Sequence, residues 1–139
     1  RLDNIQAAIL SYKLQSYNNV IERRREVAQI YQDRLSNLEV LKLPPAPNSD
    51  LDHFDVFQNY ELEADKRDDL KMYLGENGIG TLIQWGGQAV HQFKQLGFNQ
   101  VLPNTEMFFK RCIMLPMNVF ISNDDVDYIC EKVESFYKN

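Results

Sequence analysis

The sequence predicts an α+β fold, and three observations support this prediction. The first 43 residues contain neither glycine nor proline, and their apolar residues recur with a helical period. Beyond Pro44, short apolar runs typical of β-strands alternate with amphipathic segments typical of short helices. The length of 139 residues suits one domain with a sizeable core. We expect one domain over residues 1–139, in which a long helix over residues 1–36 leads into an α+β body over residues 37–139 with three or four strands.

The helical pattern is present from the first residue and runs to about Leu35. A straight helix of that length would span about 50 Å, more than the diameter of a small domain, so it must bend, break or extend to a neighbour. Because the chain starts inside this pattern without a methionine, we expect a front half of the protein to be missing. The cluster Arg23, Arg24 and Arg25 is predicted to form a solvated helix face. The periodic apolar positions are Ile5, Ile9, Tyr12, Val20, Ile21, Val27, Tyr31 and Leu35.

Proline, glycine and asparagine divide the rest of the chain into short elements. Strands are expected over Leu38–Leu43, Phe54–Leu62, Gly80–Trp85 and Ile113–Leu115, and helices over Ala64–Glu76, Val90–Leu96 and Asn104–Lys110. In the first of these helices Leu70 and Leu74 should face the core, and Asn77-Gly78 should end it. A last helix should begin after Ser122, whose hydroxyl can accept a hydrogen bond from the Asp125 amide. Its buried stripe should consist of Val126, Ile129, Val133 and Phe136.

Charge and composition exclude several classes of function. A net charge of −5 argues against binding to nucleic acid, which needs a basic face. No apolar run is long enough to span a bilayer and no signal peptide is present, so we expect no membrane contact. The cysteines, Cys112 and Cys130, lack metal-ligand spacing and should be buried thiols, which favours a cytoplasmic protein. The only histidines, His53 and His91, have no acidic or thiol partner at ligand spacing, so no metal is expected.

One segment has a composition that suggests ligand binding. A predicted strand leads through Gln84 and the only tryptophan, Trp85, into two glycines, and His91 follows shortly after. Glycines let the backbone approach a ligand closely, while tryptophan and histidine offer a stacking face and a titratable group. The residue types alone also allow a structural interpretation, in which Trp85 is buried beside a loop and His91 is hydrated on the surface. No other motif suggests a complete catalytic site.

Four short blocks of sequence together resemble a known family. The blocks are Arg1–Leu10, Lys66–Leu70 with Gly78–Thr81, Val90–Gln92, and Leu102–Glu106 with Cys112–Pro116. Their order and spacing are similar to the C-terminal part of the DegT/DnrJ/EryC1/StrS family. Its members are pyridoxal-phosphate-dependent aminotransferases that act on nucleotide-linked keto-sugars. The resemblance covers nearly the whole chain.

The resemblance implies an aspartate-aminotransferase-type fold (fold type I), with this chain as its C-terminal small domain. It also implies a homodimer with active sites at the subunit interface and a lysine that forms a Schiff base with pyridoxal phosphate. That lysine belongs to the large domain, upstream of Arg1. We therefore expect this chain alone to bind no cofactor and to be inactive, because the covalent chemistry needs that amine.

Few functional residues of the family have counterparts here. Arg1 matches the arginine of an Asn-x-Arg signature whose asparagine reaches toward the cofactor phosphate of the partner subunit. That asparagine would precede residue 1, and Arg1 is the expected cofactor-binding residue of this chain. His91 matches a histidine close to the sugar pocket. Many relatives carry a His-Tyr-Pro type sequence where this chain has Gln84-Trp85-Gly86-Gly87, a departure that bears on sugar specificity. The expected substrate-binding residues are Gln84, Trp85 and His91, and no catalytic residue is expected on this chain.

The sequence is thus interpreted as part of an enzyme that transfers an amino group, from glutamate, to a nucleotide-linked keto-6-deoxyhexose, most similar to members that aminate carbon 3. Two alternatives are open. A relative with the same fold dehydrates the sugar and carries histidine in place of the upstream lysine. A non-catalytic α+β adaptor domain would use the apolar stripe of its long helix to bind a partner.

Overall fold

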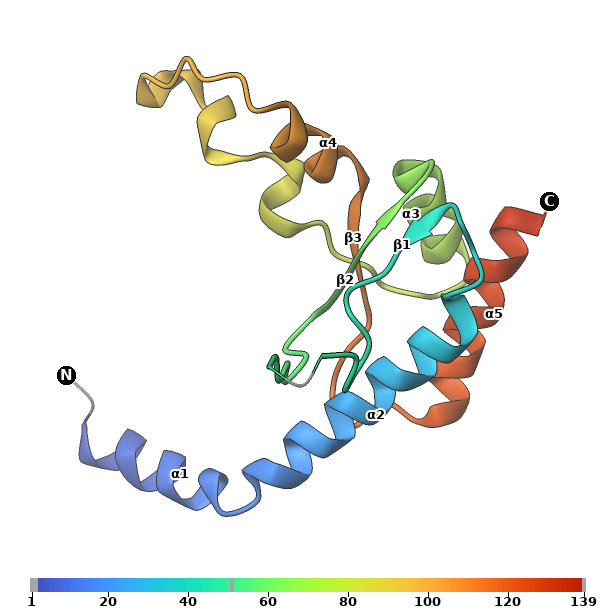
Figure 1. Cartoon of the computed structure of the whole chain (residues 1–139). Helices are drawn as coiled ribbons and strands as arrows, with labels where there is room; N and C mark the ends of the chain where they lie inside the picture. The colour runs from blue at the N-terminus through green and yellow to red at the C-terminus, as the bar shows by residue number, and fades with distance from the viewer. Residues whose placement is uncertain (1–2, 51, 139) are drawn as a thin grey trace.

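The computed structural model describes residues 3–50 and 52–138, and it confirms an α+β fold (Figure 1). The helices are α1 (Asn4–Leu14), α2 (Tyr17–Leu35), α3 (Arg67–Glu76), α4 (Pro103–Arg111) and α5 (Asn123–Lys138). The strands are β1 (Leu41–Lys42), β2 (Tyr60–Ala64) and β3 (Cys112–Leu115), and three short 3₁₀ turns cover Gln84–Gly87, Val90–Gln92 and Lys94–Leu96.

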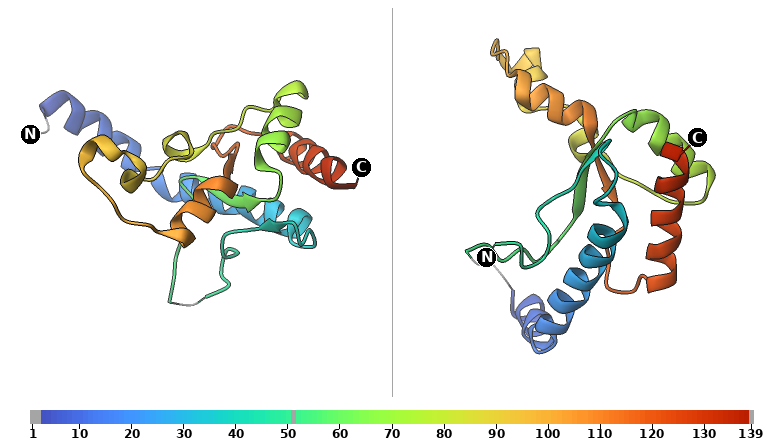
Figure 2. Two further views of the ribbon diagram at one scale, coloured as in Figure 1. Left: turned by 90° about the horizontal axis from the view of Figure 1, so that it is seen from above. Right: turned by 45° about the vertical axis from the view of Figure 1, so that its right-hand side comes forward.

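The three strands form one antiparallel sheet in the order β1-β2-β3. Leu41 pairs with Ala64 at one end, and Tyr60 pairs with Leu115 at the other. Side chains alternate between the two faces of a strand, so Tyr60, Leu62 and Ala64 share the buried face. Helices α2, α3 and α5 cover this face, and α2 and α5 lie side by side (Figure 2).

The core lies between this face of the sheet and the three helices. Leu70 and Leu74 of α3 are fully buried, as predicted, and Val126, Ile129 and Val133 of α5 are buried with them. Phe136 is partly buried against the same core. The cysteines Cys112 and Cys130 are buried free thiols, which confirms that prediction.

The predicted long helix breaks in two at Gln15 and Ser16. The amides of both residues donate to carbonyls three positions earlier, a tight turn that closes α1. The break falls just before Asn18 and Asn19, and serine and asparagine favour helix ends over helix interiors. Helix α2 packs on the core, whereas α1 extends away from the body (Figures 1 and 2).

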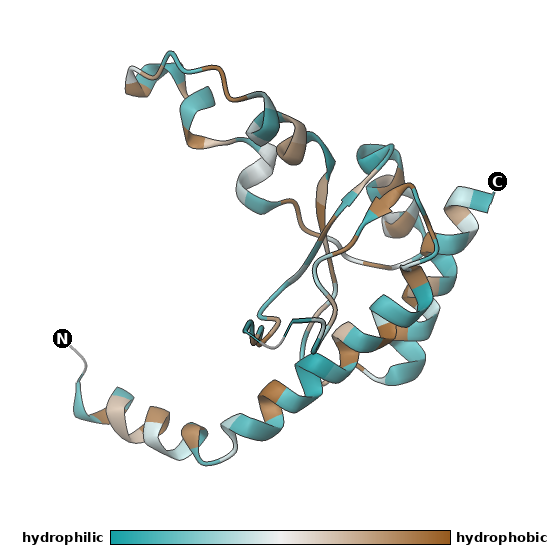
Figure 3. Ribbon diagram, in the orientation of Figure 1, coloured by the Kyte–Doolittle hydropathy of each residue, from teal (hydrophilic) through white to brown (hydrophobic). Residues whose placement is uncertain are grey.

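Helix α1 has no buried residue and exposes a set of large apolar side chains. Apolar and polar residues alternate along α1, as the hydropathy colouring of the ribbon shows (Figure 3). The set comprises Ile5, Ile9, Leu10, Tyr12 and Leu14. An apolar surface of this kind is typical of a helix that packs against another protein segment.

The arginine cluster does not form a solvated face, and that prediction was wrong. Arg24 donates to the carbonyls of Phe57 and Gln58, at 3.0 and 2.5 Å. Arg23 donates to the Ile121 carbonyl and to Asn123 Oδ1. All three arginines are half-buried, and they fasten the segments before β2 and before α5 onto α2.

Two predicted strands are shorter in the structure. β2 begins at Tyr60 rather than Phe54, because Phe57 has a left-handed backbone (φ 49°) and Arg24 occupies its carbonyl. β1 is reduced to Leu41–Lys42, because Leu38 is part of a turn that follows α2.

Two further boundaries differ from the prediction. Helix α3 begins at Arg67 rather than Ala64, because Ala64 belongs to β2 and Lys66 is left-handed (φ 52°). The predicted strand Gly80–Trp85 is limited to one bridge between Leu82 and Met114. The predictions for α4, β3 and α5 are confirmed within one or two residues.

The start of α5 confirms the predicted cap. The Asp125 amide donates to Ser122 Oγ at 3.1 Å, and the Ser122 hydroxyl donates back to Asp125 Oδ2 at 2.6 Å. The hydrogen bonds that the hydroxyl and the amide of Ser122 donate to the Asp125 carboxyl lower the pKa of that carboxyl. Within the described ranges, none of the helices has the length and apolar character needed to cross a membrane.

Candidate functional site

The segment that carries Trp85 leaves the sheet immediately after the bridge at Leu82. Its 3₁₀ turn places Trp85 in a left-handed conformation (φ 51°), a region that a bulky side chain rarely adopts. Gly86 and Gly87 continue with positive φ values of 65° and 78°, so three successive residues reverse the chain. Strain of this kind clusters at ligand-binding sites, which makes this turn the leading candidate.

Trp85 is 77% exposed, so the interpretation in which it is buried beside a loop was wrong. Its side chain lines an open apolar cavity of about 410 Å³. The only polar side chain in this lining is that of Gln88, so the cavity suits the apolar face of a ring rather than a charged group. The lining consists of Trp85, Gln88, Ala89, Val90, Phe93 and Phe109.

His91 is 8% exposed, so the surface position that the same structural interpretation gave it was also wrong. Its Nε2 lies 3.3 Å from Glu106 Oε1 on α4. Neither His91 nor the half-buried Gln84 is among the residues that line the cavity. The structure therefore brings Trp85 to the cavity and places the other two predicted residues beside it, on the same segment.

Helix α4 holds this segment at two points. At one end His91 faces Glu106, and at the other Gly87 lies against the carbonyl of Phe109. Arg67 secures that second point, because its guanidinium donates to the carbonyls of Phe109 (3.2 Å) and Cys112 (2.8 Å) beside Gly87. Gly87 has a φ of 78°, a backbone conformation that other residues rarely adopt, which accounts for a glycine there.

Sequence reasoning missed the roles of Glu106, Arg67 and Phe109. Glu106 lies 15 residues after His91, so local spacing gave no signal of the contact. An acidic residue in the first turn of a helix is explained by the helix dipole alone. The proximity of these residues is decided by the fold.

The Trp85 cavity does not offer a covalent site for pyridoxal phosphate. Lysine side chains in the described ranges do not line the Trp85 cavity, so no amine here could react with the cofactor's aldehyde. Arg1, the expected cofactor-binding residue, lies outside the described residues. The described residues also contain no cluster of three or more His, Cys, Asp or Glu side chains that could hold a metal ion.

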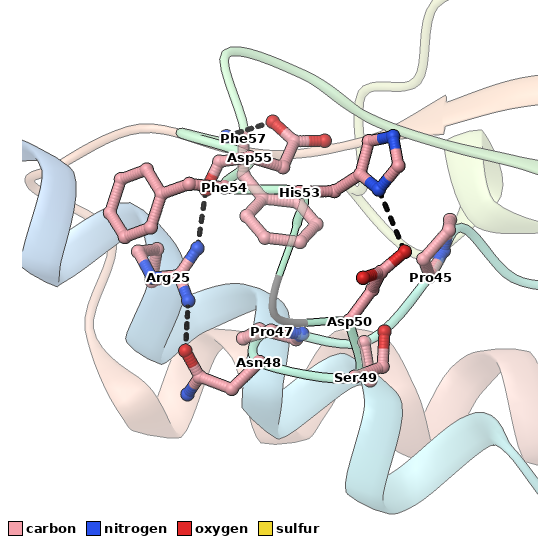
Figure 4. A pocket seen from close by; sticks show the side chains of 11 residues that line it. Arg25, Pro45, Pro47, Asn48, Ser49, Asp50, His53, Phe54, Asp55 and Phe57 are labelled. Carbon is pink, nitrogen blue, oxygen red and sulfur yellow. Dashed lines mark hydrogen bonds and ion pairs between the residues drawn. The ribbon is translucent and has the colours of Figure 1, made fainter.

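A second cavity, of about 530 Å³, lies under the loop between β1 and β2 (Figure 4). Arg25 forms its floor, donates to Asn48 Oδ1 and the Asp55 carbonyl, and lies 4.2 Å from the centre of the Phe54 ring. His53 faces Asp50 across the rim, with Nδ1 and Oδ2 2.7 Å apart. The polar groups of this cavity are thus engaged with one another, and they hold the proline-rich loop against α2.

Comparisons with known proteins agree with this architecture. The model of the DegT/DnrJ/EryC1/StrS aminotransferase family matches residues 1–134. A pleiotropic regulatory protein of Geobacillus stearothermophilus is 34% identical over 142 residues, which cover 100% of this chain and 38% of that protein. The dTDP-3-amino-3,6-dideoxy-α-D-galactopyranose transaminase of Aneurinibacillus thermoaerophilus is 29% identical, over 98% of this chain and 37% of that enzyme.

Solved structures show the same fold. A family aminotransferase from Brucella abortus superposes with a TM-score of 0.85 at 29% identity, over 100% of this chain and 37% of that one. DesV of S. venezuelae, solved with a ketimine intermediate, gives a TM-score of 0.91 at 25% identity, over 100% and 38% of the two chains. These neighbours confirm the expected fold-type-I architecture, and the chain spans a little over a third of the length of each of these relatives. The chain belongs to the DegT/DnrJ/EryC1/StrS aminotransferase family.

Proposed function

We propose that this chain is the C-terminal domain of a pyridoxal-phosphate-dependent aminotransferase that acts on a nucleotide-linked keto-6-deoxyhexose. The family match over residues 1–134 is the observation that carries the proposal. Named relatives support the substrate class, since one is a dTDP-amino-sugar transaminase and another is a GDP-perosamine synthase of Escherichia coli O157:H7, 31% identical to this chain. Glutamate is the proposed amino donor, and a homodimer in the cytoplasm is the proposed form of the full-length protein.

The chemistry of the Trp85 segment fits a sugar-binding role. The Trp85 indole can pack against the apolar face of a sugar ring, because its surface is open and the cavity beside it is apolar. The Gln84 amide and the His91 imidazole can exchange hydrogen bonds with sugar hydroxyls. Pyridoxal phosphate, bound to a lysine upstream of Arg1, would supply the amino-transfer chemistry, and Arg1 would be among the residues that hold it.

The first experiment addresses the enzyme class on the full-length protein. Bound cofactor should give an absorption band, and borohydride reduction followed by peptide mapping should place the adduct on a lysine upstream of Arg1. A colourless protein without an adduct, even after added cofactor, would overturn the enzyme proposal. It would favour an adaptor domain, for which the exposed apolar residues of α1 offer a binding surface. A protein that shows a cofactor absorption band, forms no lysine adduct on reduction and carries histidine at the lysine position would indicate the dehydratase.

The second experiment addresses the site. Trp85→Ala in the full-length enzyme should raise the KM for the sugar substrate about fivefold or more, the effect of losing roughly 1 kcal/mol of contact, while the cofactor absorption band is unchanged. His91→Ala should also raise the KM for the sugar substrate. Phe120→Ala is the control, because Phe120 is another exposed aromatic residue outside the cavity lining. If both site variants match the wild type, the assignment of the pocket is wrong.

A further inference from the structure

Glu106 is held in one orientation by the first turn of α4. Its Oε1 accepts a hydrogen bond from the Leu102 amide at 3.4 Å, and its own amide donates to the Leu102 carbonyl at 2.9 Å. The N-terminal end of a helix also favours a negative charge. The same oxygen, Oε1, faces Nε2 of His91. The Leu102 amide and the His91 imidazole thus contact the same carboxylate oxygen.

The chemistry of the two groups assigns the position of the proton on His91. An ionised carboxylate can only accept hydrogen bonds, so the ring nitrogen that faces it must carry the hydrogen. A neutral imidazole has one N–H group, and its other nitrogen is then an acceptor. Because the His91 side chain is 7% exposed, water competes little with this contact.

We propose that Glu106 is a positioning residue that fixes His91 as the Nε2–H tautomer. Nδ1 is then the only hydrogen-bond acceptor of the ring, and under the proposed function a substrate hydroxyl donates to it. The tautomer follows from the contact between the two side chains, whereas the role toward a hydroxyl rests on the proposed function. The two parts are therefore tested separately.

The chain contains a natural comparison, since its only other histidine is His53. His53 meets Asp50 through the opposite ring nitrogen, Nδ1, at 2.7 Å. Its side chain is 83% exposed, so water competes with this pair and the tautomers of His53 should interchange. One spectrum should thus show His91 as a single tautomer and His53 as an average of two tautomers.

The tautomer can be read from the long-range ¹H–¹⁵N spectrum of the ¹⁵N-labelled chain at about pH 9, where an ordinary imidazole is neutral. His53→Gln assigns the two rings. We expect the His91 ring to show a protonated Nε2 and an unprotonated Nδ1. In Glu106→Gln the side-chain amide can donate as well as accept, so the ¹⁵N shifts of the two nitrogens should move toward each other.

Glu76→Gln is the matched control, because it makes the same change of charge at an exposed position at the end of α3. It should leave the His91 signals unchanged, and Glu106→Gln should leave the His53 signals unchanged. A wild-type His91 protonated on Nδ1 would overturn the proposal. A Glu106→Gln spectrum with unchanged His91 shifts would overturn it as well.

The role in binding is tested in the full-length enzyme. Glu106→Gln should raise the KM for the sugar about fivefold, as expected for one weakened hydrogen bond, with cofactor absorption unchanged. If Trp85→Ala raises KM and Glu106→Gln does not, the proposed function stands and the positioning role is wrong. If neither variant raises KM, the pocket assignment fails, while the spectrum still decides the tautomer.

Discussion

Two buried tyrosines allow a direct test of how much one hydrogen bond contributes to this core. Tyr31 on α2 and Tyr60 on β2 are both at most 1% exposed, and their ring centres are 4.7 Å apart. The Tyr31 hydroxyl donates to the Pro116 carbonyl at 2.8 Å. The Tyr60 hydroxyl has no hydrogen-bond partner among the described residues. Burial raises the pKa of both phenols well above the usual value, so both hydroxyls are neutral at ordinary pH.

The substitutions Tyr31→Phe and Tyr60→Phe remove the same oxygen from neighbouring rings but should have different effects. Tyr31→Phe should lower the free energy of unfolding by about 1–2 kcal/mol, because it removes a hydrogen bond and leaves a carbonyl without its donor. Tyr60→Phe should leave the free energy of unfolding unchanged or raise it by up to about 1 kcal/mol, because burying an unpaired hydroxyl is unfavourable.

Urea unfolding followed by circular dichroism measures both variants. With an m-value of about 2 kcal/mol/M, the urea concentration at the unfolding midpoint of Tyr31→Phe should be about 0.5–1 M below that of the wild type. The midpoint of Tyr60→Phe should equal or exceed the wild-type midpoint. Equal losses in the two variants, with unchanged m-values, would show that the tyrosine oxygens contribute through packing and would refute this reasoning.

Three further predictions follow from the core, a helix cap and α1. Burial raises the pKa of the Cys130 thiol to about 12 and also raises the pKa of the Cys112 thiol. A thiol reagent should therefore modify both cysteines slowly in the native chain and rapidly in denaturant. Rapid modification of the native chain would contradict the burial of these thiols. Ser122→Ala should lower the free energy of unfolding by about 1 kcal/mol in urea at pH 7. Hydrogen bonds from Ser122 lower the pKa of Asp125 in the folded state, so the ionised carboxylate stabilises the fold fully above the unfolded-state pKa near 3.8, and this stabilisation is lost as the pH falls through the folded-state pKa. The wild type should therefore lose more stability than Ser122→Ala below about pH 4. Equal losses of stability in the two proteins would contradict this linkage. Ile9→Gln in the exposed helix α1 should reduce self-association, measured by sedimentation velocity, without changing the urea midpoint. An unchanged sedimentation profile would show that Ile9 takes no part in self-association.

The turn at Ser122 shows what local sequence predicts well. Its hydroxyl and the carboxylate of Asp125 are three residues apart, so their contact depends only on the geometry of one helical turn. The buried stripes of α3 and α5 were predicted for the same reason, because helical periodicity brings residues such as Leu70 and Leu74 onto one face. The strand boundary at Tyr60 was not predictable in this way, because Arg24 on another element sets it.

The sequence by itself determined the α+β class, the helix caps, the buried cysteines and, through four ordered blocks, the resemblance to the aminotransferase family. These features depend on local periodicity and on the order of residues along the chain. Only the tertiary structure decided that Trp85 is exposed and His91 is covered, since α4 supplies Glu106 and Phe109 from more than a dozen residues away. Long-range contacts such as these depend on how the helices and strands pack, and neither residue type nor sequence spacing predicts them.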